Sequence, residues 1–460
     1  MSVAAPLWLG QVRLPIKGTG MATVEIAREE SRRDQGLVRA MGVFAFAAAI
    51  TNEVVGSGIY RLPGGMVKAG GTAAPYAYLA CLLAMGAIVL CFAEAGSRVP
   101  TSGGPYGYVE AAFGKMFGFV AGVLLWLSSV LACGGIAVAL ADTVAAAFPI
   151  FEPPLLHHLV EIGVLAAMTG INLIGVDPAS RFLGWATLIK LLPLLLFILV
   201  GAIGLAMGHG AAAPPIHHAP TDGFGRAAIL ATFALTGMET PLAASGEVRD
   251  PSRTVPRALL LAMGMVGLLY ILIQVVAQSL LGAGLMESRA PLADALGSIN
   301  LHLRLPLLVG AFFSMLIWLG SDLLGAPRVL FAFARDRLLP APLGKVHPRW
   351  RTPHVAILTH FLLAAGLALT GTFEDLAVLS TLAIAPLYML VCASALKLRR
   401  DNVAIMGKPL ALPGLPVIAL FGIVSMAVLI RFGQPNEIKA LFGVLVGSSL
   451  LYLVMRRAVR

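Results

Sequence analysis

The stretch from residue 40 to residue 68 decides the fold: AMGVFAFAAAITNEVVGSGIYRLPGGMVK. It is apolar and long enough to cross a bilayer, which takes about 20 residues of helix. Yet Gly56-Ser57-Gly58 interrupts its middle, and Pro63-Gly64-Gly65 follows. Glycine and proline open a helix and free backbone polar groups, which a membrane protein tolerates only where that backbone is buried or lines a polar cavity. The stretch therefore predicts a broken membrane span with a binding site at the break.

A second break is expected where Thr236-Gly237-Met238-Glu239-Thr240-Pro241 interrupts another apolar stretch. The two breaks lie about five spans apart, which suggests two copies of inverted topology. Matched breaks in two such halves are typical of a transporter site at the bilayer midplane. The alternative is that these glycines only permit close packing or kinks, as they often do in membrane helices.

Apolar stretches recur along all 460 residues, whose mean hydropathy is +0.88 and of which only 12% are charged. The expected fold class is an all-α polytopic membrane protein, because the short alternating segments of a β-barrel are not found. Twelve transmembrane helices are predicted, at about 40–68, 73–96, 115–147, 156–175, 181–207, 225–244, 256–283, 305–333, 354–371, 376–397, 413–431 and 438–456.

The loops between these spans differ in charge, because alternate loops carry most of the Lys and Arg. The positive-inside rule then predicts a multi-pass protein of the cell membrane, the inner membrane in a bacterium, with both termini cytoplasmic. The first residues lack the apolar region and cleavage site of a signal peptide. The predicted domains are a cytoplasmic N-terminal tail at 1–38, an inverted-repeat transport core at 39–400 (repeats at about 39–208 and 224–400), and two additional C-terminal helices at 401–460.

Other classes of function have little support in the sequence. The net charge of +10 follows from the loop bias, and no basic patch with interleaved aromatic residues indicates nucleic acid. No nucleotide-binding loop, nucleophile–base pair or metal cluster is found, so we expect no enzyme activity, no cofactor and no metal. The four cysteines lie in apolar spans without metal-ligand spacing, and the histidines fall largely in loops.

Several motifs in order along residues 38–400 resemble the amino acid–polyamine–organocation (APC) superfamily. Gly56-Ser57-Gly58-Ile59-Tyr60 resembles its first-span signature G-S-G-I-F, and the loop from Pro100 to Tyr108 resembles the one after its second span. The sixth span and the trailing Asp250-Pro251 also resemble the family, although Asp250 replaces the usual Asn. The resemblance implies the five-plus-five inverted-repeat fold with broken helices 1 and 6, as in the basic amino acid/polyamine antiporters and the proton-coupled amino acid transporters.

The backbone of the first break is the predicted substrate site. The N–H groups of Gly56, Ser57 and Gly58 lie at the positive end of a half-helix, which favours a carboxylate. The resemblance implies the same role for this segment, together with Ile59. It also implies that carbonyls of the broken sixth span bind the α-amino group, and these belong to the segment Phe233, Ala234, Leu235 and Thr236. The alternative is a purely structural kink.

Lys190 is the predicted proton-coupling residue. It follows Arg181 by nine residues, which at 1.5 Å per residue places it about 14 Å deep, close to half of a ~30 Å hydrocarbon core. An intramembrane lysine is costly and is a functional hypothesis by default. The resemblance sharpens this, because proton-coupled members carry a lysine where sodium-driven relatives of the fold bind sodium. The alternative is a static lysine bonded to carbonyls at the first break.

Three acids lie in the inner parts of spans. Glu53 precedes Gly56 by three residues. Glu239 lies in the second break, where the resemblance implies a role near the substrate and in proton coupling; otherwise it is a buried acid bonded to unwound backbone. Ser321 and Asp322 lie in the eighth span, which lines the pocket in the family, although Asp322 could instead pair with Lys190 or another helix. In the inner parts of the spans these three acids outnumber the basic residues, of which Lys190 is the one found. The surplus of acid favours a substrate with a positive side chain, while protonated acids would serve a neutral amino acid equally.

Three readings compete. The first is a secondary amino acid transporter, driven by protons or by exchange, whose partners are a small substrate, protons and the lipid bilayer. The second is a transporter or antiporter of cationic amines or polyamines, for which the acids matter more than the glycine break. The third is a membrane subunit that keeps the fold without transporting, against which the intact breaks and Lys190 argue.

Overall fold

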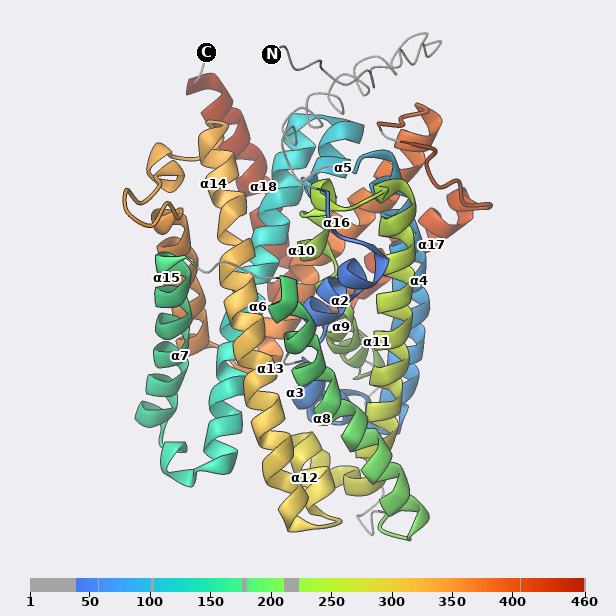
Figure 1. The fold of residues 1–460 in the computed structure, drawn as a ribbon, viewed down its shortest axis with the longest axis vertical. Helices are drawn as coiled ribbons and strands as arrows, with labels where there is room; N and C mark the ends of the chain where they lie inside the picture. Colours follow the sequence, from blue (N-terminus) through green and yellow to red (C-terminus); the bar gives the residue numbers. More distant parts are fainter. Residues whose placement is uncertain are drawn as a thin grey trace, which may run out of the picture.

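The computed structural model describes residues 39–56, 58–100, 103–175, 180–210, 223–405 and 407–458, and for 180–185 only the backbone. The expected tail at 1–38 and Ser57 lie outside the described residues. Within the described ranges the chain forms helices and no strand, and a single β-bridge joins Met41 to Val248. The helices run mostly along the long axis of the molecule (Figure 1).

The α-helices follow one another with short connections. They are α2 (Val43–Val54), α3 (Gly58–Gly70), α4 (Ala74–Arg98), α5 (Gly104–Phe113), α6 (Lys115–Ala147), α7 (Pro154–Ile174), α8 (Ser180–Ala206), α9 (Gly223–Leu235), α10 (Glu239–Leu242), α11 (Pro251–Leu281), α12 (Pro291–Gly297), α13 (Arg304–Gly325), α14 (Pro327–Arg335), α15 (His354–Thr370), α16 (Phe373–Arg400), α17 (Leu415–Arg431) and α18 (Pro435–Ala458). The 3-10 turns are η1 (Gly71–Ala73), η2 (Pro149–Phe151), η3 (Ser245–Glu247), η4 (Gly282–Met286), η5 (Leu301–Leu303) and η6 (Ala341–Gly344).

Each predicted span coincides with one or two of these helices. Among the described residues, eight helical stretches are long and apolar enough to cross a membrane, and four shorter apolar helices accompany them: α2, α9, α15 and α17. The protein is therefore an all-helical, multi-pass membrane protein, as predicted. The count of twelve crossings and the inverted repeat stay predictions. One predicted span, 305–333, is divided into α13 and α14 at Pro327, which has no backbone N–H to continue the helix.

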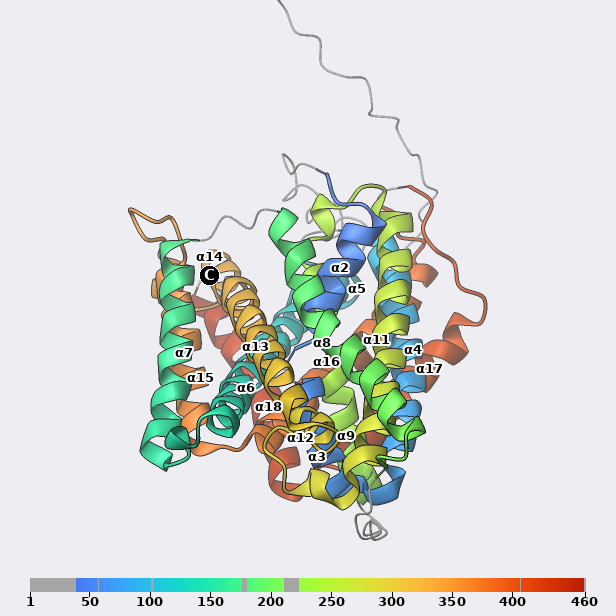
Figure 2. The ribbon, with the colours of Figure 1, turned by 60° about the horizontal axis from the view of Figure 1, so that its bottom comes forward.

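The two ends of the molecule differ in what they carry. α5, the loop after α14 and the C-terminal end of α18 lie at one end, whereas α12 and the end of α3 lie at the other (Figures 1 and 2). The loop after α14 includes Arg337, Lys345, Arg349 and Arg351. These basic side chains lie at the same end of the molecule as the C-terminal end of α18 (Figure 1). This agrees with the prediction that alternate loops carry most of the Lys and Arg.

The two predicted breaks are real interruptions of the helical backbone and pack against each other. One separates α2 from α3, and the other separates α9 from α10. In the second break Gly237 has φ +114°, which a residue with a side chain rarely adopts. A Cβ added to Gly237 would lie 3.0 Å from the carbonyl oxygen of Glu53, at the end of α2. Glycine therefore permits both the turn and the close approach of the two broken spans.

The long helix α6 passes beside this region. It packs against α16, α13 and α15, and α16 packs in turn against α9. The cysteines Cys81, Cys91, Cys133 and Cys392 are all buried free thiols in this packing, as predicted. Elements from both halves of the sequence thus surround the two breaks.

Candidate functional site

The end of α2 is held by side chains from three other helices. A helix leaves its last four carbonyl groups without intrahelical partners, and burying them unpaired would be costly. Here α8, α13 and α11 each supply one donor to three successive carbonyls. The bonds run from Lys190 Nζ to Asn52 O at 2.5 Å, from Trp318 Nε1 to Glu53 O at 2.8 Å, and from Tyr270 Oη to Val54 O at 3.0 Å.

Lys190 is fully buried, and its ammonium group lies at the C-terminal end of α2, where the helix dipole is negative. The contact with Asn52 O is the one expected of a static lysine bonded to the first break. It does not test whether Lys190 also exchanges a proton. Lys190 pairs with the backbone, and Asp322 has a different partner.

The N–H groups of the first break are partly engaged. The N–H of Gly56 donates to Val54 O at 2.9 Å, so within this structure it already has an acceptor. Gly58 begins α3, and the first four N–H groups of a helix have no acceptor within it. Ile59 is fully buried and follows in the same turn. The N-terminal end of α3 is therefore the part of the predicted carboxylate site whose N–H groups have no acceptor within their own helix.

In the second break most of the hydrogen bonds described here join residues of the break to one another. The carbonyl of Phe233 accepts from the Thr236 N–H at 3.2 Å and from its hydroxyl at 2.7 Å. The carboxylate of Glu239 accepts from the Gly237 N–H at 3.2 Å. Tyr388 of α16 donates its hydroxyl to Glu239 Oε2 at 2.9 Å. Glu239 thus joins the unwound backbone to α16.

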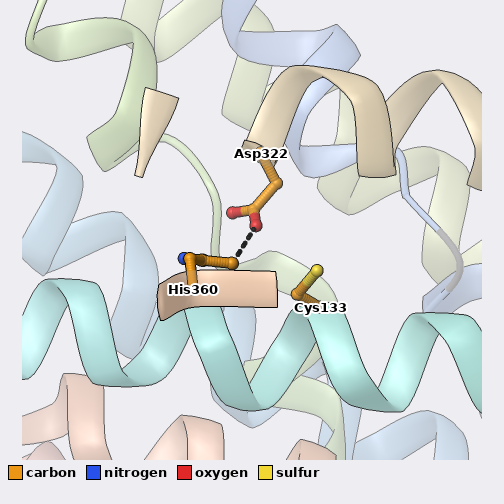
Figure 3. Close-up of side chains that lie close together, drawn as sticks. All are labelled: Cys133, Asp322 and His360. Carbon is orange, nitrogen blue, oxygen red and sulfur yellow. Dashed lines mark ion pairs between the residues drawn. The ribbon is translucent and has the colours of Figure 1, made fainter. Parts of the chain in front are cut away.

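The two other acids of the site, Glu53 and Asp322, make their contacts through adjacent residues of α13. Ser321 binds Glu53 of α2, and Asp322 itself contacts α6 and α15. Ser321 donates its hydroxyl to Glu53 Oε2 at 2.7 Å. Asp322 Oδ1 accepts from the hydroxyl of Ser129 in α6. Its other oxygen, Oδ2, lies 3.2 Å from Nε2 of His360 in α15 (Figure 3). Asp322 is therefore paired with His360 and not with Lys190.

A cavity of about 50 Å³ lies between the two breaks. This is room for about four water molecules and far below the 300–1,000 Å³ of pockets that enclose drug-sized ligands. Three carboxylates line it and, among the described residues, no Lys, Arg or His does. Its wall includes the predicted residues Glu53, Gly56, Gly58, Phe233, Ala234, Thr236, Glu239 and Asp322, but not Ile59, Lys190 or Ser321.

The structure adds residues that the sequence analysis missed. Ser128 and Ser380 line the cavity and bond to each other at 2.9 Å, and Ser129 lies beside them. Serines in apolar spans give no distinct signal in a sequence. His360 did give one, because an ionisable residue inside an apolar span is a functional hypothesis by default. The prediction that the histidines fall largely in loops misses His360, which lies inside α15.

A charged cluster lies on the α3 side of the cavity. Arg61 of α3 lies 3.4 Å from Asp142 of α6 and 3.4 Å from Glu374 of α16. It also donates to Ser288 O at 3.0 Å. The imidazole of His157 lies 3.3 Å from Asp142. This cluster ties the second half of the first span to three other parts of the chain.

Two groups of three potential donors lie close together, with donor atoms within 4.8 Å of one another: Cys133, Asp322 and His360, and His157, His158 and Glu161. Structural zinc sites use four ligands. In the first group Ser129 donates to one oxygen of Asp322, and in the second group the two histidines pair with Glu161. We assign neither group to a metal, and the expectation of no metal and no cofactor stays a prediction.

Known proteins resemble this chain over nearly its whole length. The family model described as amino acid permease matches residues 41–455. The uncharacterized transporter Mb2022c of Mycobacterium bovis is 29% identical over 442 residues, which cover 94% of each chain. The branched-chain amino acid permease BcaP of Bacillus subtilis is 26% identical and covers 92% of this chain and 94% of its own. The cationic amino acid transporter 4 of Mus musculus is 28% identical over 84% of this chain and 64% of its own.

Proposed function

Because this chain belongs to the amino acid permease family, we propose that it is a secondary active transporter that carries an amino acid through the cavity between its two broken spans. The observation that supports this most is that both breaks line one cavity in the interior. Unwound backbone at membrane depth is typical of substrate sites in such transporters. The cavity is too small for an amino acid, so the cycle includes states in which it is larger and open to one side at a time.

The proposed architecture has twelve crossings, with two inverted repeats at about 39–208 and 224–400 and two further helices. Both termini then lie in the cytoplasm, at the end that carries the basic loop after α14. The pairing of α2–α3 with α9–α10 supports this, because each is a span interrupted at its middle. A cysteine-labelling map of the loops in intact cells, with α12 and the loop after α14 as its two reference points, tests it.

The substrate carboxylate is proposed to bind at the start of α3, near Gly58, where the first N–H groups have no acceptor within the helix. The substrate's amino group, and any positive side chain, would face the acids. Glu53, Glu239 and Asp322 line the cavity without a cationic side chain among the described residues. A buried carboxylate is stabilised either by protonation or by a nearby positive charge. This supports a cationic amino acid as substrate, and a cationic amine or polyamine as the second candidate.

Proteoliposomes separate these candidates. The purified protein is reconstituted, and uptake is measured for labelled arginine, lysine, putrescine and leucine, each with and without the same compound inside. Arginine or lysine uptake supports the main proposal, and putrescine uptake alone supports the amine reading. If the proteoliposomes take up no compound faster than protein-free liposomes do, the interpretation that remains is a membrane subunit that does not transport.

Lys190 is proposed to couple transport to protons, together with Glu239. Its ammonium neutralises the end of α2 through Asn52 O, so loss of a proton there would weaken the attachment of α2 to α8. We expect Lys190→Ala to lose accumulation driven by a proton gradient, by about tenfold or more, while exchange of internal for external substrate persists.

Lys397→Ala is the matched control, because Lys397 pairs with Asp401 at the end of α16, outside the cavity. It should accumulate substrate as the wild type does. Equal gradient-driven accumulation by Lys190→Ala and the wild type would exclude coupling at Lys190 and leave it as a structural cap.

A further inference from the structure

Asp322 and His360 form a pair that spans the wall of the cavity. Asp322 lines the cavity, whereas His360 does not and is fully buried behind it. Oδ2 and Nε2 lie 3.2 Å apart, from helices α13 and α15, with Cys133 of α6 beside them (Figure 3). Among the described residues His360 is the only histidine that is buried. A carboxylate at the cavity is thus backed by a buried imidazole.

The polar atoms of this pair are incompletely used. Oδ2 of Asp322 and both nitrogens of His360 are buried and have no hydrogen bond of good geometry within the described residues. Ser129 satisfies only the other oxygen of Asp322. Buried polar atoms without partners are costly, and a proton held between Oδ2 and Nε2 would satisfy two of the three.

The charge of the pair depends on that proton. With the proton, the pair is neutral overall, either as imidazolium and carboxylate or as imidazole and carboxylic acid. Without it, Asp322 leaves a net charge of −1. A net charge away from water is disfavoured unless a counter-charge is close. A positive group of the substrate in the cavity can supply this counter-charge, because Asp322 faces it.

The surroundings offer few competing charges. The one ion pair that Asp322 makes within the described residues is with His360. The end of α7 lies beside the start of α15, since Thr352 donates to Leu173 O, so the ionisable groups at the start of α7 lie at the far end. The titratable and charged groups on the neighbouring elements are Cys133 of α6, which lies beside the pair, His157, His158 and Glu161 at the far end of α7, Arg328 and Arg335 of α14, and Glu53 and Glu239 in the cavity region.

We propose that Asp322 and His360 form a proton-binding site, separate from Lys190, at which one proton and the positive group of the substrate exclude each other. Entry of the cation releases the proton from the pair, and return of the proton displaces the cation. This inference rests on the proposed function, and it makes the pair the point at which a cationic substrate is exchanged for a proton.

Binding at different pH values tests the proposal. Wild type and His360→Gln are purified in detergent, and affinities for arginine, putrescine and leucine are measured from pH 5.5 to 8.5. In the wild type, competition with one proton weakens arginine or putrescine binding by up to about tenfold for each pH unit of acidification. Leucine has no positive side chain and should show a smaller change. In His360→Gln the pH dependence for the cations should fall to less than half.

Two matched variants separate this from a general effect on packing. His209→Gln and His302→Gln each remove an exposed histidine away from the pair; both should keep the wild-type pH dependence. A second measurement needs no variant: arginine or putrescine added to the wild type in weak buffer at pH 7 should release up to one proton per site, read with a pH-indicator dye.

The outcomes are distinguishable. Cation binding by the wild type without proton release, or an unchanged pH dependence in His360→Gln, would overturn the proton site and leave the transporter proposal intact. Saturable binding of leucine alone would overturn the cationic substrate and this inference with it, but not amino acid transport. Failure of all three probes to bind or be transported would count against the proposed function itself.

Discussion

Gly58 shows how much one missing side chain decides at this site. It is the first residue of α3 and lines the cavity. A Cβ at this position would lie 3.1 Å from Leu62 Cδ1 and 3.6 Å from the Cα of Ala234 in α9. The first contact is to a flexible side chain, which can move, so a small side chain is tolerable there. The larger effect of any added carbon is to fill part of the cavity that is the proposed substrate site.

We expect Gly58→Val to weaken substrate binding by about tenfold or more, equivalent to about 1.4 kcal/mol, while the protein stays folded. Gly86→Val is its control, because a Cβ at Gly86 would meet no heavy atom within 4 Å. Competition binding and thermal unfolding in the same detergent measure the two effects. Wild-type affinity in Gly58→Val would argue against a carboxylate site at the start of α3.

At the scale of elements, the end of α4 fastens the segment before α17. Glu94 is fully buried and binds Arg98 at 2.9 Å. Its second oxygen accepts from the Leu412 N–H at 3.0 Å, while Arg98 donates to Val403 O at 3.2 Å. One buried ion pair therefore joins α4 to the connection between α16 and α17.

We expect Glu94→Gln to destabilise the protein by about 3–5 kcal/mol, because it leaves a buried cation without its partner. The exposed pair of Glu152 and Arg289, 3.7 Å apart, gives the comparison. Glu152→Gln should cost less than about 1 kcal/mol. Thermal unfolding midpoints of the two variants should differ clearly, and similar midpoints would mean that the Glu94 pair does not hold this connection.

At the scale of the whole molecule, the charged cluster around Arg61 closes the α3 end by joining α3 to α6 and α16. Its pairs are partly exposed, so each contributes about 1 kcal/mol or less. Such a sum is still enough to shift an equilibrium between two conformations severalfold. The cluster is therefore suited to hold a closed state that can be opened.

We expect Arg61→Gln to expose the cavity more often toward the α3 end. A cysteine introduced by Ser128→Cys in the cavity wall would report it, since the native cysteines are buried. Labelling of intact cells by a membrane-impermeant thiol reagent should be several times faster when Arg61→Gln is present. Lys397→Gln, at a pair away from the cavity, should not change the rate. Equal rates in all three would show that the cluster does not control access.

The sequence predicts those features that depend on local chemistry. Both breaks were found because Gly58 and Gly237 belong to glycine-containing segments inside apolar stretches, and helix opening by such segments is a local property. The helical, membrane-spanning class followed from hydropathy for the same reason. Lys190 is buried in the protein, whereas its depth in the membrane, expected from the helix rise, stays a prediction.

Other features depend on which helices pack together. The Asp322–His360 pair joins residues of α13 and α15, Tyr388 reaches Glu239 from α16, and Ser321 reaches Glu53 from α13. No spacing along the chain predicts such contacts, because they arise from tertiary packing. Pairing of Asp322 with another helix was one of the two alternatives, but its partner could not be named from the sequence.

The three donors on the end of α2 also constrain how the protein can move. If α2 swung alone, it would have to leave Lys190, Trp318 and Tyr270 together. Val54 O would keep the Gly56 N–H, but the abandoned acceptors Asn52 O and Glu53 O would each cost about 1–3 kcal/mol. A movement of α2 alone relative to the other helices therefore has a high free-energy cost. A hinge outside the cluster would cost less, and it would carry α2 and parts of α8, α11 and α13 as one rigid piece.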